Sequence, residues 1–157
     1  MPIEACNNTS VGMIVGNDGK LLLIERKKFP FGFACPAGHV DEGETYEEAA
    51  IRELQEEVGL SVEKLDTVFE GDMQNICRRP GGNWHHWKVF KVSSRGGVRA
   101  SEGETKSYRW VTDAELSALI ARSRDYLAGN ISEEDWRLSP GLELVWVEIL
   151  GTIKNNI

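Results

Sequence analysis

The chain has 157 residues, of which 41% are hydrophobic and 27% charged, and this length predicts one globular domain spanning residues 1–157. The mixture argues against disorder, collagen and coiled coil. With 18 basic and 25 acidic residues the formal net charge is −7, which disfavours general attraction to nucleic acid or to an anionic membrane surface. An anionic substrate would therefore need a local cation.

Two features predict that the protein stays out of membranes. The longest apolar stretches, residues 21–24 and 144–150, fall far short of the roughly 20 residues that a membrane-spanning helix needs. The N-terminal sequence MPIEACNNTS has neither the basic nor the apolar region of a signal peptide. We therefore expect a cytoplasmic protein.

The three cysteines predict reduced thiols. Cys6, Cys35 and Cys77 are far apart in the sequence, odd in number and without a C-x-x-C pair. This spacing indicates neither a disulfide framework nor a zinc site.

The first predicted elements form a β-hairpin. Residues 11–15 and 21–24 are apolar runs, and the sequence Gly16-Asn17-Asp18-Gly19 separates them. Asn and Gly tolerate the positive φ angles of tight turns. Two antiparallel strands are therefore expected here.

A helix is predicted between Thr45 and Gly59. Thr45-Tyr46-Glu47-Glu48 fits a capping box, and Gly59 suits the left-handed position that ends a helix. At 100° per residue, the residues expected on one apolar side, facing a sheet, are Ala50, Ile51, Leu54 and Val58.

The rest of the chain continues the alternation of strands and helices. Strands are expected at 65–69, 85–92 and 108–111, a loop at 75–83, and helices from Thr112 to about Arg122 and within 140–153. Strand alternation places Trp87 opposite Phe90, and we expect core packing for at least one of them. The pattern leaves residues 123–138 undetermined. This order suggests an α/β fold, a mixed sheet with helices on both faces.

Three acidic side chains share one face of the predicted helix. Glu53, Glu56 and Glu57 fall within a sector of about 100°. Like charges at these spacings destabilise a helix by about a few tenths of a kcal/mol each. The alternatives are a solvated acidic face and a bound cation that offsets the repulsion.

Two neighbouring features favour the cation. Ala49 and Ala50 lie next to the acidic sector, where small side chains would let a ligand approach. The preceding loop, residues 38–44, contains glycines that would bring backbone carbonyls and another carboxylate close. Hard oxygen donors favour Mg²⁺ or Mn²⁺ over zinc.

The same segment carries a family resemblance. Gly38, five residues, Glu44, seven residues and then RELQEEVGL from Arg52 to Leu60 resemble the signature box of the Nudix hydrolases at every defined position. The resemblance covers 23 of the 157 residues, and the flanking order of strands and helices is also similar to that of the family.

The resemblance implies a Nudix-like α/β/α sandwich with a mixed β-sheet, and hydrolysis of a pyrophosphate linkage with Mg²⁺, or alternatively Mn²⁺. Carried onto this chain, Glu53, Glu56 and Glu57 would bind the metal and Gly38 would lend its backbone carbonyl. Glu44 and Arg52 would be supporting partners, an ion pair that orients the glutamates.

The general base stays open among several carboxylates. Glu53 and Glu57 are candidates on the helix. Glu104 is the third, because it resembles an acid that many family members contribute to the metal site from a loop; Glu102 is its rival, and either one would otherwise be a solvated charge. The resemblance also implies that Arg26 is near the substrate phosphates, with a surface ion pair as the alternative, whereas His39 is expected to be incidental.

The sequence does not identify the substrate. The proline that resembles ADP-ribose hydrolases is absent, since Asn75 and Ile76 stand at its place. We expect a small nucleotide, namely a nucleoside diphosphate-X such as a nucleotide sugar or a nucleoside triphosphate, and no nucleic acid or membrane partner; a homodimer is left open. The alternatives are a catalytically silent nucleotide-binding module and an isoprenoid-diphosphate isomerase.

Overall fold

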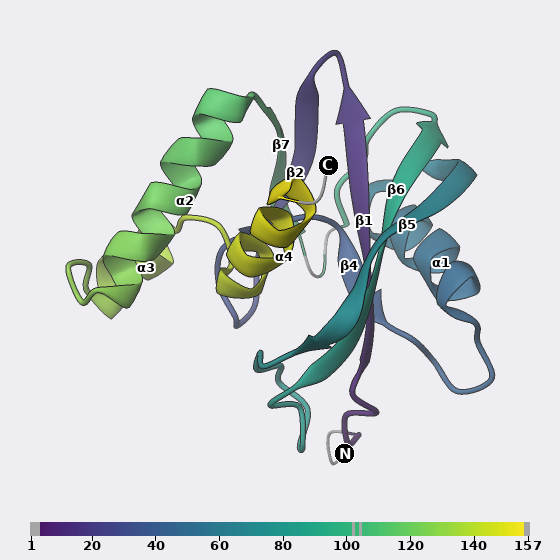
Figure 1. The fold of residues 1–157 in the computed structure, drawn as a ribbon, viewed down its shortest axis with the longest axis horizontal. Helices are drawn as coiled ribbons and strands as arrows, with labels where there is room; N and C mark the ends of the chain where they lie inside the picture. The colour runs from purple at the N-terminus through teal and green to yellow at the C-terminus, as the bar shows by residue number, and fades with distance from the viewer. Residues whose placement is uncertain (1–3, 102, 104, 156–157) are drawn as a thin grey trace.

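Figure 1 shows the computed structural model of the chain, which describes residues 4–101, 103 and 105–155. In chain order its elements are β1 Thr9–Asn17, β2 Lys20–Arg26, β3 Phe33–Ala34, β4 Ala37–His39, α1 Tyr46–Val58, β5 Ser61–Met73, β6 His85–Arg95, β7 Thr105–Val111, α2 Asp113–Leu127, α3 Glu133–Leu138 and α4 Leu144–Asn155.

The strands form one mixed sheet. Its main path runs β3-β2-β1-β6-β5, with β4 paired to β1 and β7 paired to β2. The β1–β6 pair is parallel, with Thr9 opposite His86, whereas β1 and β2 form the predicted antiparallel hairpin. Asp18 and Gly19 both have positive φ in its turn, as the local sequence predicts.

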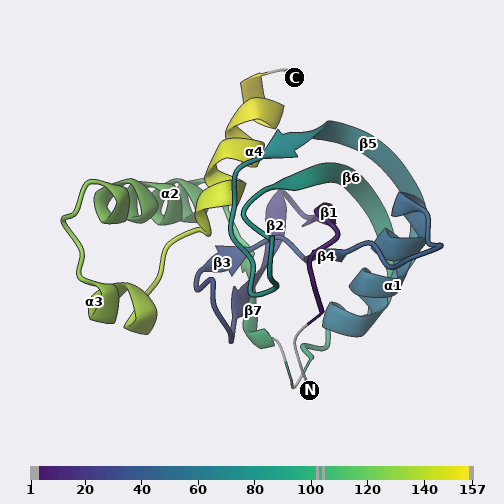
Figure 2. The ribbon, with the colours of Figure 1, turned by 90° about the horizontal axis from the view of Figure 1, so that it is seen from below.

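Helices cover both faces of this sheet, which confirms the expected sandwich. α1 lies on one side, and α4, flanked by α2, lies on the other (Figures 1 and 2). Each interface has its own hydrophobic cluster: Phe90 belongs to the α1 side and Trp87 to the α4 side. The alternation expected along β6 is therefore correct, and both aromatic side chains are core residues.

The predicted start and end of α1 are confirmed, but its predicted apolar side is partly wrong. Thr45 and Glu48 form the capping box, and Gly59 has a φ of 71° at the C-cap. Ile51, however, is 48% exposed. Ala49 and Ala50 are completely buried against the sheet, because their small side chains let the helix approach it closely, so they leave no path for a ligand.

Several elements extend beyond their predicted bounds, and in the strands the pairing partner stabilises residues that lack a strong local pattern. β5 and β6 pair over most of their lengths, and α2 continues to Leu127. The undetermined segment contains the end of α2 and the short helix α3. Within the described part of the chain, no helix is long and apolar enough to cross a membrane.

Candidate active site

A cleft of about 530 Å³ lies beside the acidic face of α1. Its walls come from β1, β2, β4, β6 and α1, from the loop between β5 and β6, and from the residue before α4. The charged residues that line it are Asp41, Glu53, Glu56, Glu57 and Glu143, and Arg26, Lys28, Arg52, Arg78 and Arg79. The cleft therefore offers both acidic and basic side chains to one ligand.

Glu53 packs directly on the backbone of Gly38. A Cβ atom added at Gly38 would overlap the Glu53 carboxylate, so this close approach needs glycine. Gly38 sits in β4, held opposite Val11 of β1. The sheet register thus brings one carboxylate of α1 against the β4 backbone.

The other two glutamates of the predicted set differ in exposure. Glu57 is only 4% exposed, and its Oε2 accepts a 3.0 Å hydrogen bond from the backbone N–H of Ala37. The side chain of Glu56, by contrast, is 60% exposed. All three acids nonetheless line the same cleft, as the helical spacing predicts.

Arg52 connects this acidic face to the loop before α1. Its guanidinium donates two hydrogen bonds to Glu44, at 2.8 and 2.9 Å, and one of 2.8 Å to Glu53. It also donates to the backbone carbonyl of His39 at 3.1 Å. The hydrogen bond from Arg52 lowers the pKa of Glu44 to about 2, so this carboxylate stays ionised.

The donor set fits a hard divalent cation. Carboxylate and backbone carbonyl oxygens are the ligands that Mg²⁺ and Mn²⁺ prefer, and Glu53, Glu56 and Glu57 present carboxylates in one cleft beside the β4 backbone. The contact between Glu53 and Gly38 leaves no room for a side chain there. An ion would reach these oxygens through the cleft, because Ala49 and Ala50 are buried against the sheet.

Arg26 lines the cleft from the end of β2. Its Nε donates a 2.8 Å hydrogen bond to the carbonyl of Pro30 and lies 3.7 Å from the Glu143 carboxylate. The side chain remains 30% exposed. Arg26 therefore has an acidic neighbour, as the ion-pair alternative expects, and it also lines the cleft.

Glu143 is a cleft residue that sequence reasoning missed. It comes just before α4, where the N–H of Glu143 donates to the Phe33 carbonyl at 2.7 Å and the N–H of Phe33 donates to the Gly141 carbonyl at 2.9 Å. Burial raises the pKa of the Glu143 carboxyl. Nothing local in the sequence marks this residue, since a contact with β3 places it.

Arg78 and Arg79 were also missed as cleft residues, although their charge was visible in a predicted loop. The loop folds back on itself, with the N–H of Cys77 donating to the Gly82 carbonyl at 2.8 Å. This turn brings both arginines to the cleft. The sequence feature that could have indicated this position is the pair of basic residues in a glycine-rich loop.

Glu102 and Glu104 lie outside the described residues. The neighbouring backbone is described: the N–H of Ser101 donates to the Glu57 carbonyl at 2.8 Å, and the N–H of Thr105 donates to the Ser101 carbonyl at 3.3 Å. The residues that flank the two glutamates are therefore tied to α1.

The three cysteines lie in two different surroundings. Cys6, Cys35 and Cys77 are free thiols, as predicted. Cys6 and Cys77, however, come together with His39 and His85, because the strands that flank them are neighbours in the sheet. His39 also lines the cleft.

A profile of the NUDIX domain matches residues 7–128. The chain belongs to the Nudix family. The match covers most of the chain and includes all elements from β1 to α2, so the described fold and the family agree.

Curated Nudix relatives differ in their named substrates. An ADP-ribose pyrophosphatase of Methanocaldococcus jannaschii is 53% identical over 76 residues, which are 47% of this chain and 44% of that protein. A putative 8-oxo-dGTP diphosphatase of Bacillus subtilis is 28% identical over 112 residues, 71% of this chain and 70% of that protein. The chain thus matches less than half of the archaeal relative.

Solved structures share the Nudix fold. A MutT protein from Methanosarcina mazei aligns with a TM-score of 0.69 over 98% of this chain and 97% of that one, at 19% identity. A MutT Nudix hydrolase from Burkholderia pseudomallei aligns with a TM-score of 0.56 over 70% and 84%, at 28% identity. The first likeness extends over the C-terminal helices as well.

Proposed function

We propose that this protein is a metal-dependent pyrophosphohydrolase that cleaves a phosphoanhydride bond in a small nucleotide. The main support for this proposal is the cleft, in which three carboxylates of α1 share one cavity with several basic side chains. Hydrolysis of a diphosphate requires neutralised phosphate charge and a deprotonated water. Acidic and basic walls around one cavity are suited to both requirements.

Each acidic residue of α1 then has a role. Glu53, Glu56 and Glu57 would hold Mg²⁺, or alternatively Mn²⁺, with the backbone carbonyl of Gly38. When bound, such an ion stabilises charge on phosphate oxygens and lowers the pKa of water. Glu44 and Arg52 touch neither substrate nor ion in this proposal, because their part is to fix the Glu53 carboxylate.

A carboxylate that is not fully engaged by the ion would take the proton from the attacking water. Glu53, Glu57 and Glu104 are the proposed candidates. Glu57 is buried and receives the Ala37 N–H. Ser101, three residues before Glu104 in the sequence, has its backbone N–H bonded to the Glu57 carbonyl.

The basic residues of the cleft would bind the substrate phosphates. Arg26, Lys28, Arg78 and Arg79 supply positive charge there, which an overall acidic protein needs locally to hold an anion. A cavity of about 530 Å³ lies within the range of roughly 300–1,000 Å³ typical of small-molecule sites. This size supports a nucleoside diphosphate-X or a nucleoside triphosphate.

The names of the relatives support the nucleotide class without selecting a member of it. They include an ADP-ribose pyrophosphatase, a putative 8-oxo-dGTP diphosphatase and RNA pyrophosphohydrolases. Asn75 and Ile76 occupy the place of the proline that resembles ADP-ribose hydrolases. We therefore propose that a phosphoanhydride bond is cleaved, and the experiment below identifies the group attached to the diphosphate.

The test is a panel of nucleoside triphosphates, dinucleotides and nucleotide sugars with Mg²⁺ or Mn²⁺, with products separated by chromatography. We expect at least one compound to be cleaved: a nucleoside triphosphate would release phosphate or pyrophosphate, and a nucleoside diphosphate-X would give a nucleoside monophosphate and the phosphorylated X group. Glu56→Gln should lower that rate by orders of magnitude, whereas Glu63→Gln, an exposed residue of β5 outside the cleft, should not. A panel without turnover, or an active Glu56→Gln variant, would refute the proposal.

A further inference from the structure

A second cluster of chemically reactive side chains lies at one end of the sheet. Cys6 precedes β1, His39 ends β4, Cys77 is in the loop between β5 and β6, and His85 begins β6. The register explains their meeting, because Ser10 lies opposite His39 and Thr9 lies opposite His86. Four residues that are distant in the chain thus converge.

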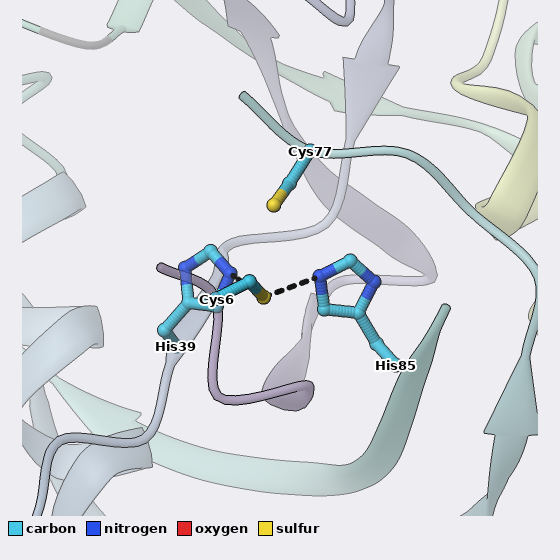
Figure 3. Close-up of side chains that lie close together, drawn as sticks. All are labelled: Cys6, His39, Cys77 and His85. Atoms are coloured by element: carbon cyan, nitrogen blue, oxygen red, sulfur yellow. Dashed lines mark hydrogen bonds between the residues drawn. The ribbon is translucent and has the colours of Figure 1, made fainter. Parts of the chain in front are cut away.

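The ligating atoms of the four side chains point toward one centre (Figure 3). The Sγ of Cys6 lies between two imidazoles, 3.5 Å from Nε2 of His39 and 3.4 Å from Nε2 of His85. The Sγ of Cys77 completes the group, and all four atoms lie within 4.8 Å of one another.

The two separations around Cys6 match an edge of a tetrahedral zinc site. With Zn–S bonds of about 2.3 Å and Zn–N bonds of about 2.0–2.1 Å, a sulfur and a nitrogen at two corners lie about 3.5 Å apart. The two sulfur–nitrogen distances around Cys6 have this value. Two thiols and two imidazoles in a tetrahedral arrangement are typical of zinc.

A backbone N–H points to each of the two sulfurs. The N–H of Asn8 points to Cys6 Sγ at 3.3 Å, and the N–H of Arg79 points to Cys77 Sγ at 3.4 Å. Hydrogen bonds to the charged form of a group favour it, and the thiolate is the form of cysteine that binds metal.

The surrounding loop is shaped to admit these sulfurs. A Cβ atom added at Gly82 would overlap the Sγ of Cys77, so the thiol occupies space that only glycine leaves open. The N–H of Cys6 donates to the Pro80 carbonyl at 2.8 Å. The N-terminal segment and the loop are thus joined at the cluster.

We propose that Cys6, His39, Cys77 and His85 form a structural zinc site whose ligands differ from the carboxylates of α1, although His39, Cys77 and His85 line the same cleft. The ion would tie the segment before β1 and the loop between β5 and β6 to the ends of β4 and β6. Arg78 and Arg79 directly follow Cys77 and line the cleft. Zinc would therefore also fix the basic wall that faces the proposed substrate.

A disulfide between Cys6 and Cys77 is the competing use of the same thiols. It would leave two imidazoles facing a sulfur without a ligand role for either one. The arrangement of both Nε2 atoms around Cys6 favours the metal. Cys35 offers a matched control, because its thiol is buried in the core cluster beneath α4.

Metal content provides the first test. Untagged protein is purified, dialysed against buffer with excess Mg²⁺ and analysed for bound zinc; we expect about one equivalent per chain. Cys6→Ser and Cys77→Ser should lose it, while Cys35→Ser and Glu56→Gln should keep it. Retention in Glu56→Gln separates this site from the acidic face of α1, and from any failure of the proposed activity.

Cobalt substitution of the wild-type protein keeps the test independent of any variant that fails to fold. Co²⁺ should give a thiolate-to-cobalt absorption band and the strong visible bands of tetrahedral coordination. Zinc removal should also speed tryptic cleavage after Arg78. Absence of both zinc and the thiolate band, or a Cys6–Cys77 disulfide in thiol titration of fresh protein, would overturn the proposal.

Discussion

The guanidinium of Arg52 holds the carboxylate of Glu44 through two hydrogen bonds, from Nε at 2.8 Å and from Nη2 at 2.9 Å. The remaining nitrogen of the same group donates to Glu53 at 2.8 Å. One rigid fork therefore fixes the loop before α1 relative to a carboxylate in the cleft. Arg52 is a positioning residue in this arrangement.

Arg52→Lys should preserve the charge and lose the fork, because an ammonium group cannot reproduce the paired geometry of a guanidinium. We expect kcat to fall about 10–100-fold, and the Mg²⁺ concentration for half-maximal rate to rise, as for other partners that orient metal ligands. Arg109→Lys is the control, because its pair with Glu115 is exposed. An unchanged metal dependence would contradict the positioning role.

Gly38→Ala should displace the Glu53 carboxylate, since the new Cβ would overlap it. A misplacement of about 1 Å at a reacting site can cost about 10²-fold in rate, and we expect a loss of that size with little change in the far-ultraviolet circular dichroism. Gly16→Ala is the matched control, because a Cβ in that strand meets only Lys20 O at 3.6 Å. Equal rates for the two variants would remove Glu53 from the site.

Glu104→Gln should lower kcat more than it changes KM if this residue accepts the proton from water, by about 10²–10⁴-fold. Glu102→Gln, two residues earlier, should have a much smaller effect. Steady-state kinetics with the substrate found in the nucleotide panel decides between them. A full rate in Glu104→Gln would move the base to Glu53 or Glu57.

Glu143→Gln should make the protein relatively more stable as the pH rises. Burial raises the pKa of this carboxyl in the folded state above its ordinary value of 4.5. Its contribution to stability is therefore present below pH 4.5 and is lost as the pH rises through the folded-state pKa. Urea unfolding of wild type and variant across this range measures the difference; parallel stability curves would exclude the effect.

The sequence predicts the parts of the site that depend on neighbours along one helix. Thr45 and Gly59 mark the ends of α1, and the spacing of Glu53, Glu56 and Glu57 brings their side chains to one cleft. These features follow from local hydrogen bonding and from 100° per residue. Ile51 was misplaced because a helical wheel does not show how far the sheet extends beneath it.

The rest of the site depends on pairings between distant segments, which no local pattern contains. Cys6 meets Cys77 because β1 and β6 are parallel neighbours, with a register that only the folded sheet defines. Glu143 reaches the cleft because the backbone before α4 bonds to Phe33. Cysteine spacing and charge patterns along the chain could not predict either meeting.

The short pairing of the backbone around Leu142 with Phe33 has a consequence for how the cleft could diversify. It delivers Glu143 from beyond residues 7–128, the part that matches the NUDIX profile. A substitution in this C-terminal segment would therefore alter the wall of the cleft while the acidic helix stays intact. In the proposed function, one residue beside the substrate would thus come from a different stretch of the chain than the metal-binding carboxylates.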